Sequence, residues 1–397
     1  MSIDLTSGSA PARAAFYNDP KVRSAVYQAA LCAVVAFLVY GATTNAIEHL
    51  QRAHIASGFG FWNNTAGFDI SQTLIEYSSQ ASTYGRAFWV GLLNTLLVAG
   101  LGVVLATILG FTVGISRLSK NWLLAKTATG YVETIRNIPL LLQLLFWYNA
   151  VLKALPEMRD SIVILGGAYL NNRGLYLPKP EFLAGFDEVL VAAIVGAIAA
   201  LVFYLWAHKR QERTGQRGPV FTVVFVLIVG LPLAALALEG VPLKFNYPQA
   251  GRFNIGGGIE VLPEFAALLF GLTIYTAAFI AEVVRAGILA VSRGQIEAAY
   301  SLGLKPGPTL RLIVVPQAMR VIIPPLTSQY LNLTKNSTLA VAIGYPDLVQ
   351  VFTGTVLNQT GQAVEVVAIT MLVYLTISLA TSLAMNLYNR RVALVER

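Results

Sequence analysis

The sequence predicts an all-α integral membrane protein with about eight transmembrane helices, and three observations support this fold class. Hydrophobic residues make up 56% of the 397 residues and charged residues only 12%, whereas about a quarter of the residues in a soluble domain are charged. Apolar runs recur along the chain, and a run of about 20 residues crosses the roughly 30 Å hydrocarbon core as a helix. The runs are too long and too continuous for barrel strands, and in lipid a helix satisfies its own backbone groups.

Hydropathy places the spans in order along the chain. The first 20 residues lack the apolar core of a cleavable signal peptide, so we expect the first span also to start membrane insertion. The least clear span is the seventh, because it holds Asn332, Thr334, Lys335 and Asn336. The predicted spans are 24–44, 87–113, 138–155, 187–207, 219–239, 264–285, 323–344 and 363–387.

Lysine and arginine orient this bundle. Most of the 28 basic residues fall in the two tails and in the loops 114–137, 208–218 and 285–322, which all lie on one side if the spans alternate. Cytoplasmic loops carry such an excess, so both termini are predicted to be cytoplasmic. The net charge of +8 then follows from the orientation of the spans in a lipid bilayer. Nucleic-acid binding is not indicated, because it would require the basic residues to cluster on one soluble face.

The chain lacks the residues that several kinds of function require. The chain has no phosphate-binding P-loop motif, and its three histidines and single cysteine, Cys32, stand without further ligands at metal spacing. We therefore expect no catalytic residue, no metal and no cofactor bound by this chain. Transport, channel and scaffold functions remain.

Polar residues within the spans are the candidates for a substrate path, because such residues tend to face a bundle interior or a watery route. For a single amide or hydroxyl, hydrogen bonding between helices is the plainer alternative. Lys335 lies about 18 Å along its span at 1.5 Å per residue, so it either snorkels outward or presents its charge to an anionic group such as a carboxylate. The candidates are Lys335, Asn336, Ser337 and Thr338, with Gln143 and Asn94 as weaker ones.

The stretch GQIEAAYSLGLKPGP at 294–308 is polar for so apolar a chain. Good helix formers follow Glu297, whose negative charge suits the first turn of a helix. Gly303 stands where a left-handed residue would end that helix, and Lys305 to Pro308 predict a turn.

A second short helix, TLRLIVVPQAMRVI, is expected after this turn. Pro316 should kink or end it, and Pro324 and Pro325 should begin the next span. Two short helices joined by a stiff turn would form a rigid cytoplasmic knob, which can transmit force.

At these residues the chain resembles a known family. Glu297, Ala298 and Ala299, then Gly303, Ile313 and Pro316, match the EAA signature of the permease subunits of bacterial ABC importers, with Val315 where leucine is usual. The runs YVETIRNIPLLLQLLFWY, AAFIAEVVRAGILAVSRGQIEAA, VVPQAMRVIIPPL and LTKNSTLAVAIG resemble the polar-amino-acid branch of that family. The extra length resembles the larger-format permeases of general L-amino-acid systems and of glutamate/glutamine/aspartate/asparagine systems.

The resemblance implies a permease with the type I ABC importer fold, which would import a broad range of L-amino acids across the bacterial inner membrane. It implies an ABC ATPase dimer that uses ATP and Mg, a second, nonidentical permease and a periplasmic amino-acid-binding protein as partners. Glu297, Ala298, Ala299 and Gly303 would form the helix that couples to the ATPase, and Pro316 would belong to the returning helix. An ion-coupled secondary transporter acting alone, and a membrane scaffold that transports nothing, are the alternatives.

The resemblance also implies a division of the chain. The outer segments 45–86 and 156–186 are either ordered loops that cover the outer face or flexible connections. The expected parts are a cytoplasmic tail (1–23), the first helix with a periplasmic loop (24–86), the first part of the permease core (87–155), an insertion with two extra helices (156–260), the second part of the core (261–390) with the EAA loop (285–322), and a cytoplasmic tail (391–397).

Overall fold

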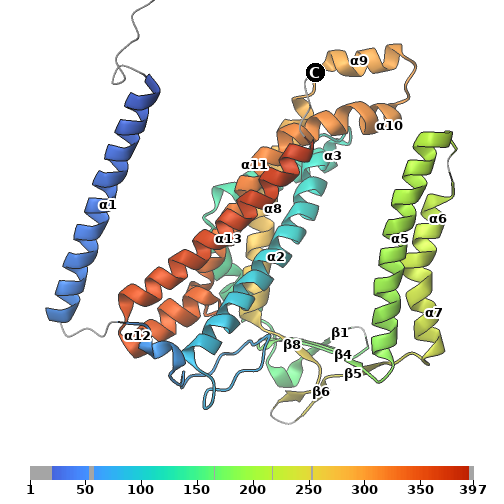
Figure 1. Cartoon of the computed structure of the whole chain (residues 1–397). Coiled ribbons are helices and arrows are strands. Elements are labelled where there is room, and N and C mark those ends of the chain that lie inside the picture. Colours follow the sequence, from blue (N-terminus) through green and yellow to red (C-terminus); the bar gives the residue numbers. More distant parts are fainter. Residues whose placement is uncertain (1–19, 53–57, 165, 217, 252–253, 393–397) are drawn as a thin grey trace, which may run out of the picture.

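The computed structural model describes residues 20–52, 58–164, 166–216, 218–251 and 254–392, so most of the two predicted tails lies outside the described residues. Long helices dominate these residues (Figure 1). The helices of six residues or more are α1 (Pro20–Arg52), α2 (Tyr84–Ser116), α3 (Trp122–Asn137), α4 (Leu140–Leu145), α5 (Phe186–Thr214), α6 (Val220–Phe225), α7 (Leu231–Leu238), α8 (Pro263–Leu289), α9 (Arg293–Ser301), α11 (Val315–Asn336) and α13 (Ala363–Val392). Short α-helical, 3-10 and π-helical segments complete them: η2 (Phe59–Asn63), η3 (Phe146–Leu152), η4 (Met158–Asp160), η5 (Val226–Gly230), α10 (Pro306–Thr309), η6 (Leu310–Val314), η7 (Ser337–Ile343), η8 (Val349–Val356) and α12 (Leu357–Thr360).

Among the described residues, seven helices are long and apolar enough to cross a membrane, or eight if one bent pair counts as a span. The number agrees with the sequence. The predicted span 138–155 falls on α4 and η3 (Leu140–Leu152), and the sequence did not predict that the preceding α3 meets this segment at 104°. The bend follows Pro139, which disfavours helical backbone at the residue before it.

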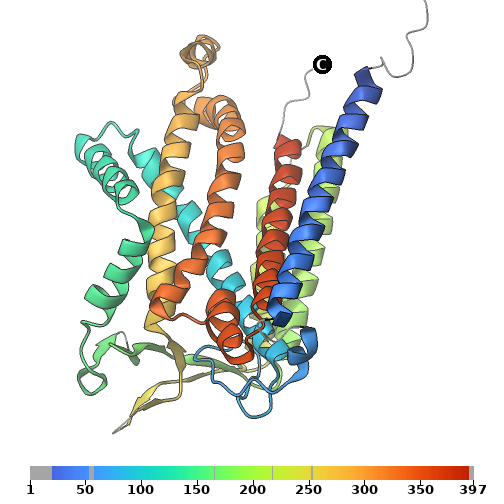
Figure 2. The same ribbon diagram turned by 90° about the vertical axis from the view of Figure 1, so that its left-hand side faces the viewer.

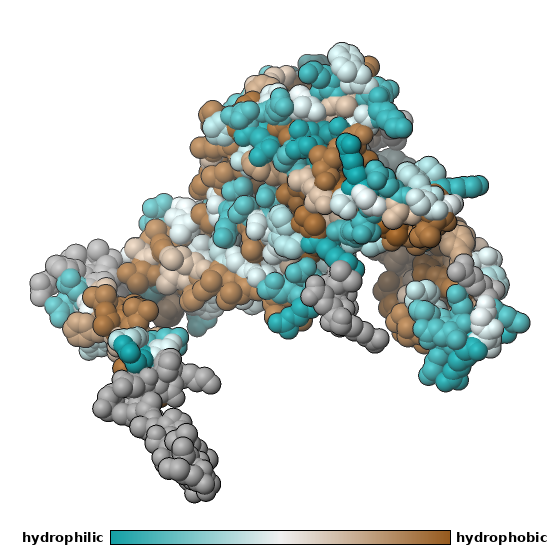
Figure 3. Space-filling model, turned by 90° about the horizontal axis from the view of Figure 1, so that it is seen from above, coloured by the Kyte–Doolittle hydropathy of each residue, from teal (hydrophilic) through white to brown (hydrophobic). Residues whose placement is uncertain are grey.

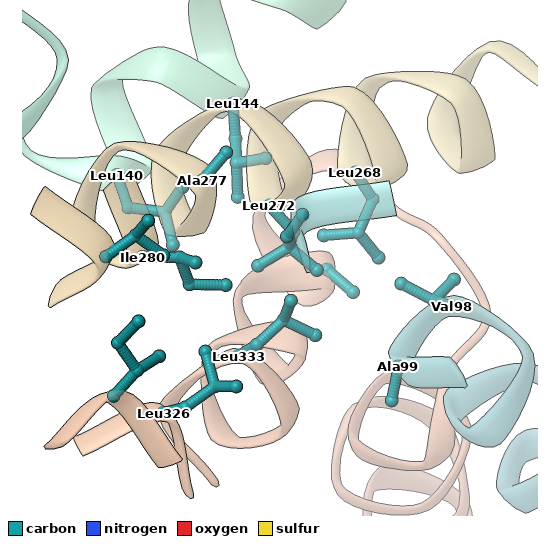
Figure 4. Close-up of a cluster of buried hydrophobic side chains, with 14 of the residues drawn as sticks. Val98, Ala99, Leu140, Leu144, Leu268, Leu272, Ala277, Ile280, Leu326 and Leu333 are labelled. Atoms are coloured by element: carbon teal, nitrogen blue, oxygen red, sulfur yellow. The ribbon is translucent and has the colours of Figure 1, made fainter. Parts of the chain in front are cut away.

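The core lies where α2, α8 and α11 cross. Figure 4 shows the side chains of Leu268, Leu272, Val98 and Leu333 converging there, and all four are buried. Helices α2 and α8 approach closely at Gly110, where an added Cβ would lie 2.6 Å from the Cβ of Ile280. Small residues at such crossings let helix backbones touch, which is how helices associate in lipid without a hydrophobic driving force.

The prolines of the seventh span do not divide it. The helix runs from Pro306 to Ile343 without a sharp break, and Pro324 and Pro325 lie inside α11 rather than at the start of a span. Pro316 is the second residue of α11 and follows η6 directly, so its missing N–H falls inside this continuous helix. The preceding η6 is a π-helical segment in which the N–H of Val315 donates to the carbonyl of Leu310. The widened turn carries the helix across a proline that was expected to kink or end it.

The end of the molecule opposite α9 contains short strands, which an all-α prediction missed. They pair antiparallel in the order β1-β2-β3-β8, with separate pairs β4-β5 and β6-β7. The strands are β1 (Ile162–Ile164), β2 (Ala168–Asn171), β3 (Gly174–Leu177), β4 (Lys179–Phe182), β5 (Leu243–Asn246), β6 (Gln249–Ala250), β7 (Ile255–Gly256) and β8 (Ile259–Val261). Of the two outer segments, the described part of 156–186 is therefore ordered, and 58–83 packs through Phe61 and Ala66 against α2 and η8.

Two parts stand away from the core. Figure 1 shows α1 on one side of the other helices and the hairpin of α5 with α6, η5 and α7 on the other, and in the turned view of Figure 2 α1 lies in front of that hairpin. Within the hairpin, Gly196 lets the helices touch, since its Cβ position is 2.2 Å from the carbonyl oxygen of Leu227. The start of α1, the last turn of α5 and the last turn of α13 lie on the same side of the molecule as α9, and the strands lie on the opposite side (Figure 1).

Candidate functional site

Helix α9 projects beyond the end of the bundle and is stopped sharply (Figure 1). Gly303 has a φ of 76°, as predicted for a left-handed cap. The N–H of Gly303 donates to the carbonyl of Tyr300 at 2.9 Å, and the N–H of Leu304 donates to that of Ala299 at 3.1 Å. These two bonds form a Schellman motif, which satisfies the last carbonyls of the helix and fixes the direction in which the chain leaves.

Two details of this region differ from the prediction. Helix α9 begins at Arg293, so Glu297 lies in the second turn and has little to gain from the helix dipole. The predicted turn over 305–308 is shorter than expected, because α10 already starts at Pro306. Proline is favoured at that first helical position, where its missing N–H costs nothing.

Burial distinguishes an exposed face of α9 from a buried one. Glu297 and Ala298 are exposed, as are Tyr300 and Leu302, the last at 83%. Ala299 is only 3% exposed, so its side chain is turned toward the rest of the chain. The side chain of Gln317, next to Pro316, approaches Gln295 of α9 at 3.5 Å between Nε2 and Oε1. The EAA residues therefore divide into an outward pair, Glu297 and Ala298, and an inward alanine.

A cavity of about 320 Å³ opens between α8 and α11. Three amide side chains, two hydroxyls and two aromatic rings line it, and none of the lining side chains is charged: Tyr275, Thr276, Phe279, Gln329, Asn332 and Asn336. Amides both donate and accept hydrogen bonds, so this lining can bind groups of either sign. A cation stands next to it, because the guanidinium carbon of Arg136 lies 5.0 Å from the centre of the Phe279 ring.

Of the four main substrate-path candidates, Asn336 lines the cavity. Lys335 is exposed in the last turn of α11, on the neighbouring strip of the helix surface. Ser337 is fully buried and donates to the carbonyl of Thr334 at 2.8 Å, and the Thr338 hydroxyl donates to the carbonyl of Lys335 at 2.8 Å.

The two weaker candidates hold the backbone. Gln143 is buried and donates through Nε2 to the carbonyls of Ile135 and Ile138, each at 2.9 Å, across the bend between α3 and α4. Asn94 is also buried and donates through Nδ2 to the carbonyls of Gln72 at 2.8 Å and Pro346 at 2.9 Å. Neither side chain lines the cavity between α8 and α11.

Residues 102–394 match the model of a protein family described as "Binding-protein-dependent transport system inner membrane component". The chain belongs to this permease family. It is 54% identical over 385 residues to the general L-amino acid transport system permease protein AapQ of Rhizobium johnstonii, covering 97% of this chain and 96% of AapQ. It is 43% identical over 429 residues to the glutamate/glutamine/aspartate/asparagine transport system permease protein BztB of Rhodobacter capsulatus, covering 99% of this chain and 100% of BztB.

Among solved structures, the permease is similar to the crystal structure of an amino acid ABC transporter with histidines. The TM-score is 0.46 and the identity 22%, with 78% of this chain and 95% of that chain covered. The family places this chain in ABC importers as the transmembrane permease subunit, which works with an ATPase and a binding protein as separate chains. The signature read at Glu297 to Pro316 led to the same family.

Five of the six cavity residues were not among the candidates chosen from the sequence: Tyr275, Thr276, Phe279, Gln329 and Asn332. A periodic signal was available on α11, where polar residues at 329, 332 and 336 share one helix face. The matching face of α8 could not be chosen in the same way, because a tyrosine, a threonine and a phenylalanine also fit a lipid-facing or core surface.

Proposed function

We propose that this permease forms part of an ATP-driven importer that moves L-amino acids, over a broad range, from the periplasm into the cytoplasm. The identity of 54% to a permease of a general L-amino acid transport system, over nearly the whole of both chains, supports the substrate class. The observation that carries the mechanism is the protruding α9, with Glu297 and Ala298 facing outward and its end fixed at Gly303.

The proposed assembly contains an ABC ATPase dimer, a second, nonidentical permease and a periplasmic amino-acid-binding protein. The ATPase binds and hydrolyses ATP with Mg, and the exposed face of α9 docks into the ATPase. The protein lies in the bacterial inner membrane with both termini cytoplasmic. In support, the described chain begins in α1 and ends in α13 on the side of α9 (Figure 1).

The cavity between α8 and α11 is proposed as this chain's part of the substrate path. An amino acid carries one carboxylate and one ammonium, and the amides of Gln329, Asn332 and Asn336 can donate to the first and accept from the second. Arg136 adds a positive potential beyond Phe279. A lining with no charge of its own suits a broad substrate range, because it opposes neither acidic nor basic side chains. Lys335 remains a candidate at the edge of this path.

Crosslinking tests the docking with a matched control. A cysteine at Ala298 should crosslink to a cysteine in the groove of the ATPase in the assembled, active complex, whereas a cysteine at Ala299 should not, because Ala299 faces inward. If both positions or neither crosslink, α9 does not dock by this face.

Uptake tests the transport itself. Proteoliposomes that contain both permeases and the ATPase, supplied with the binding protein, should accumulate amino acids only with ATP. Leucine in place of Asn332 or Asn336 should lower uptake at least about tenfold, because a charged group of the amino acid would lose a hydrogen bond that contributes about 1.5–3 kcal/mol. Accumulation driven by an ion gradient without ATP would contradict the proposal and support the secondary transporter.

A further inference from the structure

The end of α5 on the α9 side of the molecule carries a hollow of about 200 Å³, far from the cavity described above. One aromatic residue, three basic residues and a threonine line it: Trp206, Lys209, Arg210, Arg213 and Thr214. This end belongs to the hairpin inserted between the two parts of the permease core. Viewed from above, hydrophilic residues gather over the tip of the hairpin, with hydrophobic residues beneath them (Figure 3).

The charges around α5 are segregated. At 3.6 residues per turn, the five lining residues fall within an arc of about 140°. His208 and Glu212 lie on the other side of the helix, where their side chains pair with each other at 3.8 Å. No carboxylate lines the hollow, and no ion pair of Lys209, Arg210 or Arg213 is found among the described residues. The three cations thus act together on an unneutralised surface.

The aromatic residue gives this surface a shape. The guanidinium carbon of Arg210 lies 5.4 Å from the centre of the Trp206 ring, so the cation stacks on the indole. Trp206 is itself 54% exposed at the level where the polar end of the helix meets its apolar part. Tryptophan prefers this boundary in a membrane, because one part of its ring is apolar and the other donates a hydrogen bond.

Directly below the cations, the same side of α5 is apolar and uncovered. Val195, Ile198 and Val202 are all more than half exposed and fall on the strip that leads up to Lys209 and Arg213. The packed face of α5, at Gly196 and Ala200, is turned toward η5 and α7 and leaves this strip free. A molecule that fits both parts has an anionic head and long apolar chains.

Helix-end and orientation effects do not account for the whole arrangement. Basic residues in a last turn favour the helix dipole, and basic residues near a span orient it in the membrane. Either effect is satisfied by cations spread around the helix. Neither requires them on one side, above an exposed apolar strip and next to a stacked indole.

We propose that the cytoplasmic end of α5 binds the phosphate headgroup of an anionic phospholipid, with the acyl chains along Val202 and Val195. Arg210 and Arg213 donate to the phosphate oxygens, as arginine does in bidentate phosphate contacts. Lys209 adds a point charge, and Trp206 covers the glycerol region. The lipid would hold the hairpin at a fixed height beside the transporter core, from which Figure 1 shows it separated.

Native mass spectrometry of the assembled transporter tests the site. The complex is purified with an equimolar mixture of phosphatidylglycerol and phosphatidylethanolamine, and the ratio of the two retained lipids is measured. Replacing Lys209, Arg210 and Arg213 together by glutamine should lower the ratio of phosphatidylglycerol to phosphatidylethanolamine by at least about fivefold, since one basic side chain near an anionic surface contributes about that factor. The mass of the intact complex in the same spectrum confirms assembly.

The matched control replaces Lys120, Lys126 and Arg311, three exposed basic residues outside the hairpin, by glutamine. This variant loses the same charge and should keep the lipid ratio of the unchanged protein. An unchanged ratio in the α5 variant, or an equal fall in the control, would overturn the proposal. Displacement of phosphatidylglycerol by inorganic phosphate as readily as by added phosphatidylglycerol would also overturn it, because the site would then bind a soluble anion.

Discussion

Replacing Gly303 by alanine should loosen the end of α9 without touching any neighbour. A Cβ at this position would meet no atom within 4 Å, so the cost is purely that of the backbone. The φ of 76° is left-handed, and a residue with a Cβ pays roughly 1–2 kcal/mol there. That free energy corresponds to a factor of about 5–30 in the equilibrium between the capped and the frayed helix end.

Hydrogen exchange of backbone amides measures this directly. The N–H groups of Gly303 and Leu304 are the two donors of the cap, so protection of the Leu304 amide should fall by about 5–30-fold in Gly303→Ala. The control is Gly294→Ala in the first turn of α9, where φ is not positive and an added Cβ also meets nothing within 4 Å. Unchanged protection in Gly303→Ala, or an equal loss in the control, would refute the assignment of Gly303 as a strained cap. In the assembled importer, the same variant should lower uptake per ATP hydrolysed.

Three further variants test the fold. Gly110→Ala should lower the free energy of unfolding by about 1–3 kcal/mol, because the new Cβ would lie 2.6 Å from the Cβ of Ile280. The control Gly100→Ala should leave the stability unchanged, because its new Cβ would meet no atom within 4 Å. Thermal unfolding in detergent compares the two variants. Asn94→Ala should cost a similar amount in the same assay, because the buried carbonyl of Pro346 and the partly buried carbonyl of Gln72 lose their donor. Burial raises the pKa of the Asp347 carboxyl, outside the long spans, to about 7 from an unfolded value near 3.8. The folded protein then binds the extra proton between these two values, so its stability should fall as pH rises from about 4 to 7, by at most about 1.4 kcal/mol per pH unit, and Asp347→Asn should flatten that profile.

The membrane spans could be predicted because hydropathy over some 20 residues is a local property. The angle between α3 and α4 could not, since Pro139 indicates only a break in the helix, and Gln143 spans that break by donating to two carbonyls that only the folded chain presents. The prolines misled for a related reason. A proline breaks an isolated helix, but in α11 the π-helical segment η6 ahead of Pro316 and the packing of the span against α8 carry the helix through.

The end of α9 and the cavity between α8 and α11 also differ in how far the sequence predicts them. The stop of α9 is encoded in consecutive residues, so Gly303 could be recognised as its cap from sequence alone. The cavity is formed where two helices cross, and its lining depends on which face of α8 meets which face of α11. Neighbouring residues such as Asn336 and Ser337 look equivalent in sequence, yet one lines the cavity and the other is buried against its own helix. The short outer strands were missed because two to four residues are too few to show an alternating pattern.

The chain order links the two parts mechanically. Helix α8 leads into α9 through three residues, and α9 leads through α10 and η6 into α11, so the two helices that flank α9 are also the two walls of the cavity. Phe279 lies ten residues before the end of α8, about 15 Å along a helix at 1.5 Å per residue. A displacement of α9 by a partner would pass through these short connections into the helices that form both walls, and the hydrogen bond between Gln317 and Gln295 links the returning segment to α9. The cap at Gly303 keeps the end of α9 from fraying, so α9 moves as a rigid helix. We therefore expect the stability of this cap to affect how far a displacement of α9 moves the two walls of the cavity.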